Sequence, residues 1–390
     1  MNDQVRPPRS LFITQDYPPR IGGAQSYYWG VIQTLDPDDL VIIAPAHPDA
    51  AAFDAAYPYR VIRTERSIML PDRGLLDLAL RQINAHGLEL VQFGHCLPLG
   101  LLGPALRRCG HPYLVFILGA EVTLPAVLPV SGQAIRAVMR EASLMVAVSR
   151  YTAVQAQRLV AGCVPTAVLD PAIDIDEFSP PGDAGARRAA KEALGIEGEL
   201  VVCLGRLVPR KGQDRLIDAV ALLQRTRPDL HLALIGGGRL DGRLRRRSAR
   251  VGLAGRVHHL GAIPLADVQS WLRAADVFAS PCRDRWGGYE VEGFGLVFAE
   301  ASLCGAPVLA GRSGGAPEAV RVAETGIVVD GHTAAEVAQG LQRLLDLSAD
   351  ERWLMGARGR RAALERHAPE VVGNRYRALL TQALRDAEGE

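Results

Sequence analysis

Short apolar segments alternate with helical segments along this chain, in two successive blocks. Each block holds six strand candidates. They are residues 10–14, 40–44, 59–63, 90–93, 113–118 and 144–148 in the first block, and 200–204, 231–235, 257–260, 277–279, 308–310 and 326–329 in the second. Strands that alternate with helices form parallel sheets that helices cover on both faces. The pattern predicts an α/β fold with two Rossmann-like domains.

Residues 169–185 (LDPAIDIDEFSPPGDAG) separate the two blocks and are rich in proline, glycine and acidic residues, as interdomain connections often are. We therefore expect an N-terminal domain over residues 1–178 and a C-terminal domain over residues 179–368. A last helical stretch follows, and residues 369–390 are expected to pack back on the N-terminal domain. A chain of 390 residues is long enough for two such cores.

The charge balance argues against a nucleic-acid partner. The net charge is +1, and residues 1–178 carry 14 arginines, no lysine and 17 acidic residues, a net of −3. No apolar run reaches the ~20 residues of a membrane span, and the first residues lack the apolar region of a signal peptide, so we expect a cytoplasmic protein. Peripheral membrane contact at most is expected; the −3 balance argues against a membrane-docking face, although a local patch such as Arg60, Arg63, Arg66 and Arg73 could serve as one. The six cysteines lack metal-ligand spacing, so no metal site is expected.

Residues 290–307 (EVEGFGLVFAEASLCGAP) join a glycine-broken loop to a helix that is expected to begin at Leu296. The start of a helix has unpaired backbone N–H groups and a partial positive charge, which favour an anion. Glu292 and Glu300 flank this start, and carboxylates accept hydrogen bonds from sugar hydroxyls. The stretch therefore suits a nucleotide-diphosphate sugar. An ordinary amphipathic helix with two solvated glutamates is the alternative.

Two further loops carry features of a phosphate site. Arg206 and Lys211 follow the strand candidate 200–204, and a lysine at a helix start opposes the helix dipole unless an anion lies there. Gly22 and Gly23 follow the first strand candidate and would let backbone N–H groups approach a phosphate. The alternative for Arg206 and Lys211 is that they are two solvated cations. The alternative for Gly22 and Gly23 is a turn that requires positive φ. Together, the loops predict a diphosphate site in a cleft between the two domains.

Several motifs then resemble one known family. They are EGFGLVFAEASLCGAPVLA, GRLVPRKGQD, PPRIGGAQSY, RSIMLP and SGGAPE, and they are spread over nearly the whole chain. The chain resembles the retaining family-four glycosyltransferases of the GT-B architecture. Among them, it is most similar to the actinobacterial phosphatidylinositol mannosyltransferases.

The resemblance implies roles for particular residues. Arg206 and Lys211 would hold the donor diphosphate, Glu292 the hydroxyls of the donor sugar, and Glu300 the ribose. The other implied donor contacts are backbone N–H groups or apolar side chains, from Gly22, Gly23, Leu260, Ile263, Phe294, Gly295 and Leu296. Gln25 matches a position that contacts the acceptor in this family.

The sequence departs from the family at Leu118. Relatives commonly have His-Gly at the end of this strand, whereas here the segment reads FILGAEV, with Leu118 before Gly119. Leu118 should border the acceptor without donating a hydrogen bond to a sugar. We expect His95, in the segment QFGHC, to supply a polar contact to the acceptor instead. A histidine satisfied by backbone groups at a strand end is the alternative.

We therefore expect a retaining, metal-independent hexosyltransferase with no cofactor. Its partners would be a nucleotide-sugar donor, with GDP favoured, and a soluble small-molecule acceptor. Arg206, Lys211 and Glu292 would be catalytic, and Arg206 and Lys211 would stabilise charge on the leaving diphosphate. Lys211 and Glu292 should both be replaceable without loss of the fold. The alternatives are a phosphatidylinositol-type lipid mannosyltransferase at the membrane and a GT-B nucleotide-sugar epimerase.

Overall fold

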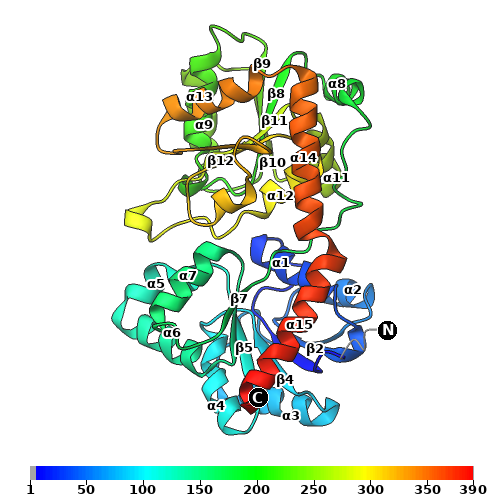
Figure 1. Ribbon diagram of the computed structural model, residues 1–390, viewed down its shortest axis with the longest axis vertical. Helices are drawn as coiled ribbons and strands as arrows, with labels where there is room; N and C mark the ends of the chain where they lie inside the picture. Colours follow the sequence, from blue (N-terminus) through cyan, green and yellow to red (C-terminus); the bar gives the residue numbers. More distant parts are fainter. Residues whose placement is uncertain (1–5, 390) are drawn as a thin grey trace. The chain divides into compact units, whose positions relative to one another are not determined.

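The computed structural model describes residues 6–389, which form two units (Figure 1). The first unit comprises the described residues up to Ala172 together with those from Pro369 onward, and the second comprises Ile173–Ala368. The boundary therefore precedes the expected one, which lay after Phe178. The physical reason is burial, since the side chains of Ile173 and Phe178 belong to the core of the second unit.

A seven-stranded parallel sheet is the centre of the described part of the first unit. Its spatial order is β3-β2-β1-β4-β5-β6-β7. The strands are β1 (Ser10–Ile13), β2 (Leu40–Ala44), β3 (Arg60–Arg63), β4 (Leu90–Phe93), β5 (Tyr113–Ile117), β6 (Leu144–Ala147) and β7 (Thr166–Val168). The helices are α1 (Gly23–Ile32), α2 (Ala50–Ala55), α3 (Arg73–His86), α4 (Gly103–Arg108), α5 (Leu124–Val127), α6 (Pro129–Glu141), α7 (Arg150–Leu159) and α15 (Pro369–Glu388).

Successive side chains of each strand point to opposite faces of this sheet. Leu11 and Ile13 of β1 enter a core that α3, α4, α6 and α7 cover. Phe12, between them, points the other way and packs edge-on against Tyr28 of α1. The same face receives Tyr376 of α15, whose hydroxyl donates to the Gln92 side chain. The last helix (red in Figure 1) is therefore part of the first unit.

The second unit contains a parallel six-stranded sheet, of order β10-β9-β8-β11-β12-β13 in the described residues. The strands are β8 (Glu199–Leu204), β9 (Leu230–Ile235), β10 (Val257–Gly261), β11 (Val277–Ser280), β12 (Val308–Gly311) and β13 (Gly326–Val329). The helices are α8 (Ala184–Ala193), α9 (Gln213–Leu223), α10 (Asp241–Arg250), α11 (Leu265–Ala274), α12 (Leu296–Leu303), α13 (Ala334–Leu345) and α14 (Ala349–His367).

Both faces of this second sheet are also covered. Leu200 and Val202 of β8 point into a core shared with α11, α12 and α14. Val201 and Cys203 point into a separate core shared with α9, α10 and α13. The prediction of two doubly wound α/β sheets is confirmed. Among the described strands, β7 is the one that the sequence analysis missed.

Local signals fix helix ends in both units. Helix α3 begins after Asp72, whose side chain accepts a hydrogen bond from the Leu75 N–H at 2.9 Å. It ends at Gly87, where φ is 57°. Helix α14 begins with a capping box between Ser348 and Glu351. Among the helices of residues 6–389, none is both long and apolar enough to cross a membrane.

Candidate functional site

Each sheet has a switch point at its centre, where the connections from two neighbouring strands leave toward opposite faces; open α/β sheets bind ligands at this position. In the first sheet the switch point lies between β1 and β4, and in the second between β8 and β11. Asp16 follows β1 and His95 follows β4. Lys211 follows β8, and Cys282 follows β11. These four residues therefore follow the strands that border the two switch points.

In the second unit, the structure joins two predicted residues, Lys211 and Glu292. The Lys211 Nζ lies 2.8 Å from the Glu292 Oε2, and both residues are 6% exposed. The Arg210 Nε lies 3.6 Å from the same oxygen, and the Cys282 thiol donates to it at 3.7 Å. This pairing places two cationic groups beside one buried carboxylate.

The ion pair keeps both groups charged. Burial by itself would lower the pKa of Lys211 and raise the pKa of Glu292, because it disfavours the charged forms. The attraction between the two groups outweighs burial on each side. The pKa of Lys211 is consequently raised, and the pKa of Glu292 is lowered with a further contribution from Arg210. A fixed ammonium group thus lies at the end of β8.

The SGGAPE motif positions Glu292 through its backbone. The Ser313 hydroxyl accepts a hydrogen bond from the Glu292 N–H at 3.1 Å, and the Gly315 N–H donates to the Glu292 carbonyl at 2.9 Å. A Cβ on Gly314 would lie 2.0 Å from that carbonyl oxygen. The motif therefore acts by close backbone packing around the catalytic candidate.

Helix α12 begins at Leu296, as predicted, directly after Gly295. Gly295 has a φ of 87°, and a Cβ there would lie 2.7 Å from the Phe298 ring, so glycine is required. Phe294 is buried, and its ring packs against His367 with 5.6 Å between centroids. The first N–H groups of α12 are thus held next to Glu292 in the chain, where an anion would be favoured.

The other predicted donor residues have different environments. Burial raises the pKa of Glu300 to about 7, although the nearby charge of Lys211 opposes this shift. The Arg206 side chain is exposed. Leu260 and Ile263 are partly buried against the edge of the second-unit core. Of this set, Arg206 is therefore the residue whose side chain is most accessible to solvent.

In the first unit, His95 lies between two carboxylates rather than against backbone groups. Its Nε2 is 2.6 Å from the Asp16 Oδ2, and its Nδ1 is 2.8 Å from the Glu121 Oε1. Burial lowers the pKa of His95, but the hydrogen bonds to Asp16 and Glu121 outweigh it and raise the pKa to about 10. The imidazole is therefore a cation at neutral pH, and the cluster carries a net charge of −1 when both carboxylates are ionised.

The same cluster contains the other predicted acceptor residues. The Gln25 side-chain amide donates to the Asp16 Oδ1 at 2.6 Å. The N–H groups of Leu118 and Gly119 donate to the Glu121 Oε2 at 3.2 and 3.1 Å. Leu118 thus takes part through its backbone, while its side chain supplies no polar group.

The predicted glycines lie at the start of α1, which begins at Gly23. A Cβ on Gly22 would lie 2.4 Å from the Gln25 Oε1, so a side chain at residue 22 would displace this amide. A Cβ on Gly23 would meet no described atom within 4 Å. The absence of a side chain at Gly22 therefore lets the Gln25 amide keep its place, and Gly23 leaves open space at the start of the helix.

Sequence reasoning missed Asp16, Glu121, Arg210 and Cys282. Asp16 and Glu121 each lie a few residues beyond a predicted strand end, a position that could have singled them out. Arg210 directly precedes Lys211, and Cys282 follows β11 at the second switch point. The distances among these groups depend on the fold and cannot be read from the sequence.

Two of the arginines named for the possible membrane patch have acidic partners in the structure. The Arg63 guanidinium makes two hydrogen bonds to Asp54, at 2.9 and 2.7 Å, and lies over the Tyr17 ring. Arg66 pairs with Asp72 at 3.1 Å. Two of the four arginines therefore have partners within the first unit, while Arg60 and Arg73 are exposed, and membrane contact through this patch stays a prediction.

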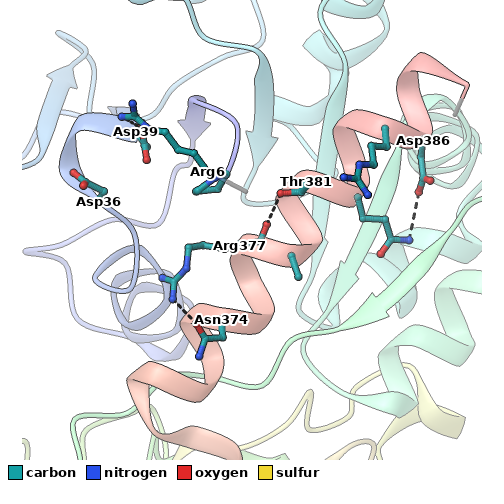
Figure 2. A pocket seen from close by; sticks show the side chains of 11 residues that line it. Arg6, Asp36, Asp39, Asn374, Arg377, Thr381 and Asp386 are labelled. Atoms are coloured by element: carbon teal, nitrogen blue, oxygen red, sulfur yellow. Dashed lines mark hydrogen bonds and ion pairs between the residues drawn. The ribbon is translucent and has the colours of Figure 1, made fainter. Parts of the chain in front are cut away.

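In the first unit, a cavity of about 830 Å³ lies between α15 and the segment around Asp36, and neither Asp16 nor His95 lines it (Figure 2). Several of its charged groups are already paired. Arg6 binds Asp39, and Arg377 donates to the Asn374 side chain and to the Thr34 carbonyl. The cavity is therefore a weaker candidate for a substrate site than either switch point.

The chain is similar to known glycosyltransferases. Residues 187–362 match the model of the family described as glycosyl transferases group 1. The chain is 40% identical over 380 residues to a GDP-mannose-dependent alpha-(1-6)-phosphatidylinositol monomannoside mannosyltransferase of Mycolicibacterium smegmatis, and the alignment covers 95% of this chain and 98% of the relative. A D-inositol 3-phosphate glycosyltransferase of Jonesia denitrificans is 39% identical over 202 residues, covering 49% of this chain and 46% of that protein.

Solved structures support the fold. The Anabaena protein HepE, in complex with UDP, superposes with a TM-score of 0.80 at 21% identity, over 96% of this chain and 99% of that chain. A sucrose-phosphate synthase of Thermosynechococcus elongatus gives a TM-score of 0.77 at 20% identity, over 95% and 98% of the two chains. The chain therefore belongs to the group 1 glycosyltransferases with the GT-B fold, in the family of the mycobacterial phosphatidylinositol monomannoside mannosyltransferases.

Proposed function

We propose that this protein transfers mannose from GDP-mannose to a phosphatidylinositol mannoside lipid. The observation that carries the proposal is the 40% identity to a named enzyme of this specificity over 95% of the chain. This similarity favours the lipid-acceptor alternative over the soluble acceptor that the sequence analysis preferred. The acidic balance of the first domain and the Leu118 departure, which motivated that preference, do not outweigh it.

On the donor side, Lys211 and Arg206 bind the diphosphate together with the N–H groups at the start of α12. Glu292 binds sugar hydroxyls, and Glu300 binds the ribose. As the bond between the sugar C1 and the phosphate oxygen breaks, negative charge grows on the diphosphate, and the Lys211 ammonium and Arg206 stabilise this charge. These groups supply charge that a divalent cation supplies in other sugar transferases.

On the acceptor side, the Asp16–His95–Glu121 cluster and Gln25 orient the acceptor hydroxyl. The acceptor oxygen attacks C1 on the face from which the diphosphate departs, and a phosphate oxygen takes the hydroxyl proton. This route forms one C–O bond, breaks one, and retains the configuration at C1. None of the residues proposed for the site is needed as a covalent nucleophile.

The proposal is tested by transfer assays with GDP-, UDP- and ADP-linked sugars against three acceptors: phosphatidylinositol, phosphatidylinositol monomannoside in vesicles, and soluble inositol 3-phosphate. Of the three kinds of donor, we expect only GDP-mannose to give a mannolipid product, and NMR should show that the new linkage has the α configuration. Preferential transfer to inositol 3-phosphate would support a soluble acceptor. Release of an isomerised nucleotide sugar without acceptor would indicate an epimerase.

Replacing either member of the Lys211–Glu292 pair should lower both activity and stability. The expectation that these residues can be changed without affecting the fold needs correction, because both are buried and paired. We expect Lys211→Met and Glu292→Gln each to reduce kcat/KM at least about 100-fold and to cost about 3 kcal/mol in the free energy of unfolding. Denaturant unfolding and steady-state kinetics measure the two effects.

The double variant Lys211→Met/Glu292→Gln separates the two effects, because it removes both members of the 2.8 Å ion pair and leaves neither of them buried without the other, although Arg210 also loses Glu292 as a partner. It should regain most of the stability and remain inactive. Lys191→Met is a matched control, since Lys191 forms another ion pair in the same unit, with Asp276 at 2.7 Å. It should lose stability and keep its activity per folded molecule. An active double variant would contradict the proposed roles.

The raised pKa of Glu300 predicts a pH-dependent cost in stability. The pKa rises from 4.5 to about 7 on folding, so the native state holds this proton more tightly than the unfolded state does. The contribution of Glu300 to the free energy of unfolding is complete below pH 4.5 and is lost as the pH rises through about 7. Glu300→Gln should therefore be more stable than wild type at pH 8, by about 1–3 kcal/mol, with little difference at pH 5.

The same variant should bind GDP more weakly at pH 8, because an amide replaces the carboxylate that accepts from the ribose hydroxyls. Denaturation at the two pH values and calorimetric GDP titration provide the measurements. Glu324→Gln, at an exposed glutamate of the same unit, is the control. An unchanged affinity of Glu300→Gln for GDP would contradict the proposal that Glu300 binds the ribose.

His95→Gln should weaken acceptor use without affecting donor binding. We expect the acceptor KM to rise at least about tenfold, with an unchanged Kd for GDP, because the variant leaves two carboxylates without their shared cation. The folded pKa of about 10 exceeds the usual 6.5, so the stability from His95 is complete below pH 6.5 and is lost as the pH rises through about 10.

The stability difference between wild type and His95→Gln should therefore be about 3 kcal/mol at pH 6 and should shrink toward pH 10. Denaturant unfolding at both pH values measures it, with His111→Gln, outside the cluster, as the control. A pH-independent difference would mean that His95 is not held as a cation.

A further inference from the structure

The segment between β11 and α12 exposes two large aromatic side chains. Trp286 is 62% exposed and Tyr289 is 43% exposed, and they lie in a tight loop with the sequence RWGGYE. All four tryptophans of the chain lie within residues 6–389, and of these Trp286 alone is exposed. Burying these rings against a ligand would remove considerable apolar area from water.

The base of this loop is held firmly. The Arg283 N–H donates to the Arg210 carbonyl at 2.8 Å, and the Arg283 side chain pairs with Asp214 at 2.9 Å. Arg285 and Glu290 exchange backbone hydrogen bonds of 3.0 and 3.2 Å, and their side chains pair at 2.6 Å. The two aromatic residues therefore project from a closed and anchored turn.

The tip of the loop keeps Trp286 in an unfavourable backbone conformation. Trp286 has a φ of 52°, and Gly287 and Gly288 also have positive φ, at 66° and 94°. A bulky residue in the left-handed region costs on the order of 1–2 kcal/mol. The Arg285 guanidinium lies over the indole, 4.8 Å from the ring centroid. The ring is thus braced in its exposed position.

The loop is continuous with the donor site. Glu290 precedes Glu292 by two residues, so their Cα atoms are at most about 7 Å apart. Arg283 is bonded to Arg210, which itself lies beside the Glu292 carboxylate. The acceptor sugar must lie next to the donor sugar that Glu292 is proposed to hold. The base of the loop begins beside Glu292.

We propose that Trp286 and Tyr289 bind the pyranose ring of a mannosylated acceptor, an inference that rests on the proposed function. The apolar C–H face of the sugar packs on the aromatic rings, and Arg285 and Glu290 offer hydrogen-bonding groups to its hydroxyls. Insertion into a membrane fits less well, because it would bring Asp284, Arg285 and Glu290 into an apolar medium. The loop selects a glycosylated acceptor over a bare inositol phosphate.

The experiment compares wild type with Trp286→Leu, Trp286→Phe and Trp353→Phe. Trp353 is a matched control, since its ring also packs against an arginine, Arg187, at 5.1 Å. The probes are steady-state transfer to phosphatidylinositol monomannoside in vesicles, hydrolysis of GDP-mannose without acceptor, and intrinsic fluorescence during titration with methyl α-D-mannopyranoside in the presence of GDP.

We expect Trp286→Leu to raise the acceptor KM at least about tenfold, while the KM for GDP-mannose in hydrolysis is unchanged. Trp286→Phe should keep the acceptor KM within about threefold but lose the fluorescence response, and Trp353→Phe should keep both. An unchanged acceptor KM in Trp286→Leu overturns the inference. So does weaker binding of this variant to anionic vesicles that lack glycolipid, which would mark the loop as a membrane anchor.

Failure of the proposed function has a different signature. If wild type does not use phosphatidylinositol monomannoside, the proposed acceptor is wrong, but the methyl mannoside titration still tests the loop. A saturable fluorescence response that depends on Trp286 would then support sugar binding at the loop. Absence of that response in wild type would overturn it.

Discussion

The carboxyl ends of parallel strands all lie along one edge of a sheet, and this constraint governs where chemistry can occur in both units. Each sheet reverses its strand order at the centre, so loops from two neighbouring strands diverge there and leave room for a ligand. The residues proposed for substrate binding cluster at these two positions. Elsewhere, polar groups such as Arg63 with Asp54 and Lys191 with Asp276 are paired with each other and serve the fold.

The two switch points use the same physical device with opposite signs. In the second unit, Lys211 and Arg210 share one buried carboxylate, which leaves an excess of positive charge suited to a diphosphate. In the first unit, Asp16 and Glu121 share one histidine cation, which leaves an excess of negative charge suited to hydroxyl donors. In both clusters the shared counter-ion holds the other two groups in fixed positions. Preorganisation of this kind lets charge stabilise a transition state without rearrangement.

Around the proposed donor site, several groups are kept in positions that do not favour stability. Glu300 is a carboxyl whose pKa is raised by burial, and Trp286 is a bulky residue with positive φ. Gly295 and Gly314 are required because the backbone approaches its neighbours too closely for a Cβ. Such features persist only where the surrounding packing holds them, and they commonly mark functional sites. They lie within residues 286–314, which include the stretch 290–307 that the sequence analysis singled out.

The sequence by itself determined the fold class, the family and most of the donor-site candidates, because hydrophobic periodicity and short motifs are local signals. It identified Lys211, Glu292 and the start of α12 at Leu296. The tertiary structure alone decided that Lys211 and Glu292 are buried against each other, that His95 is a cation between Asp16 and Glu121, and that Ile173 and Phe178 belong to the second core. These facts depend on distances between residues far apart in the chain, and on burial that sets protonation. Neither quantity is encoded in any single stretch of sequence.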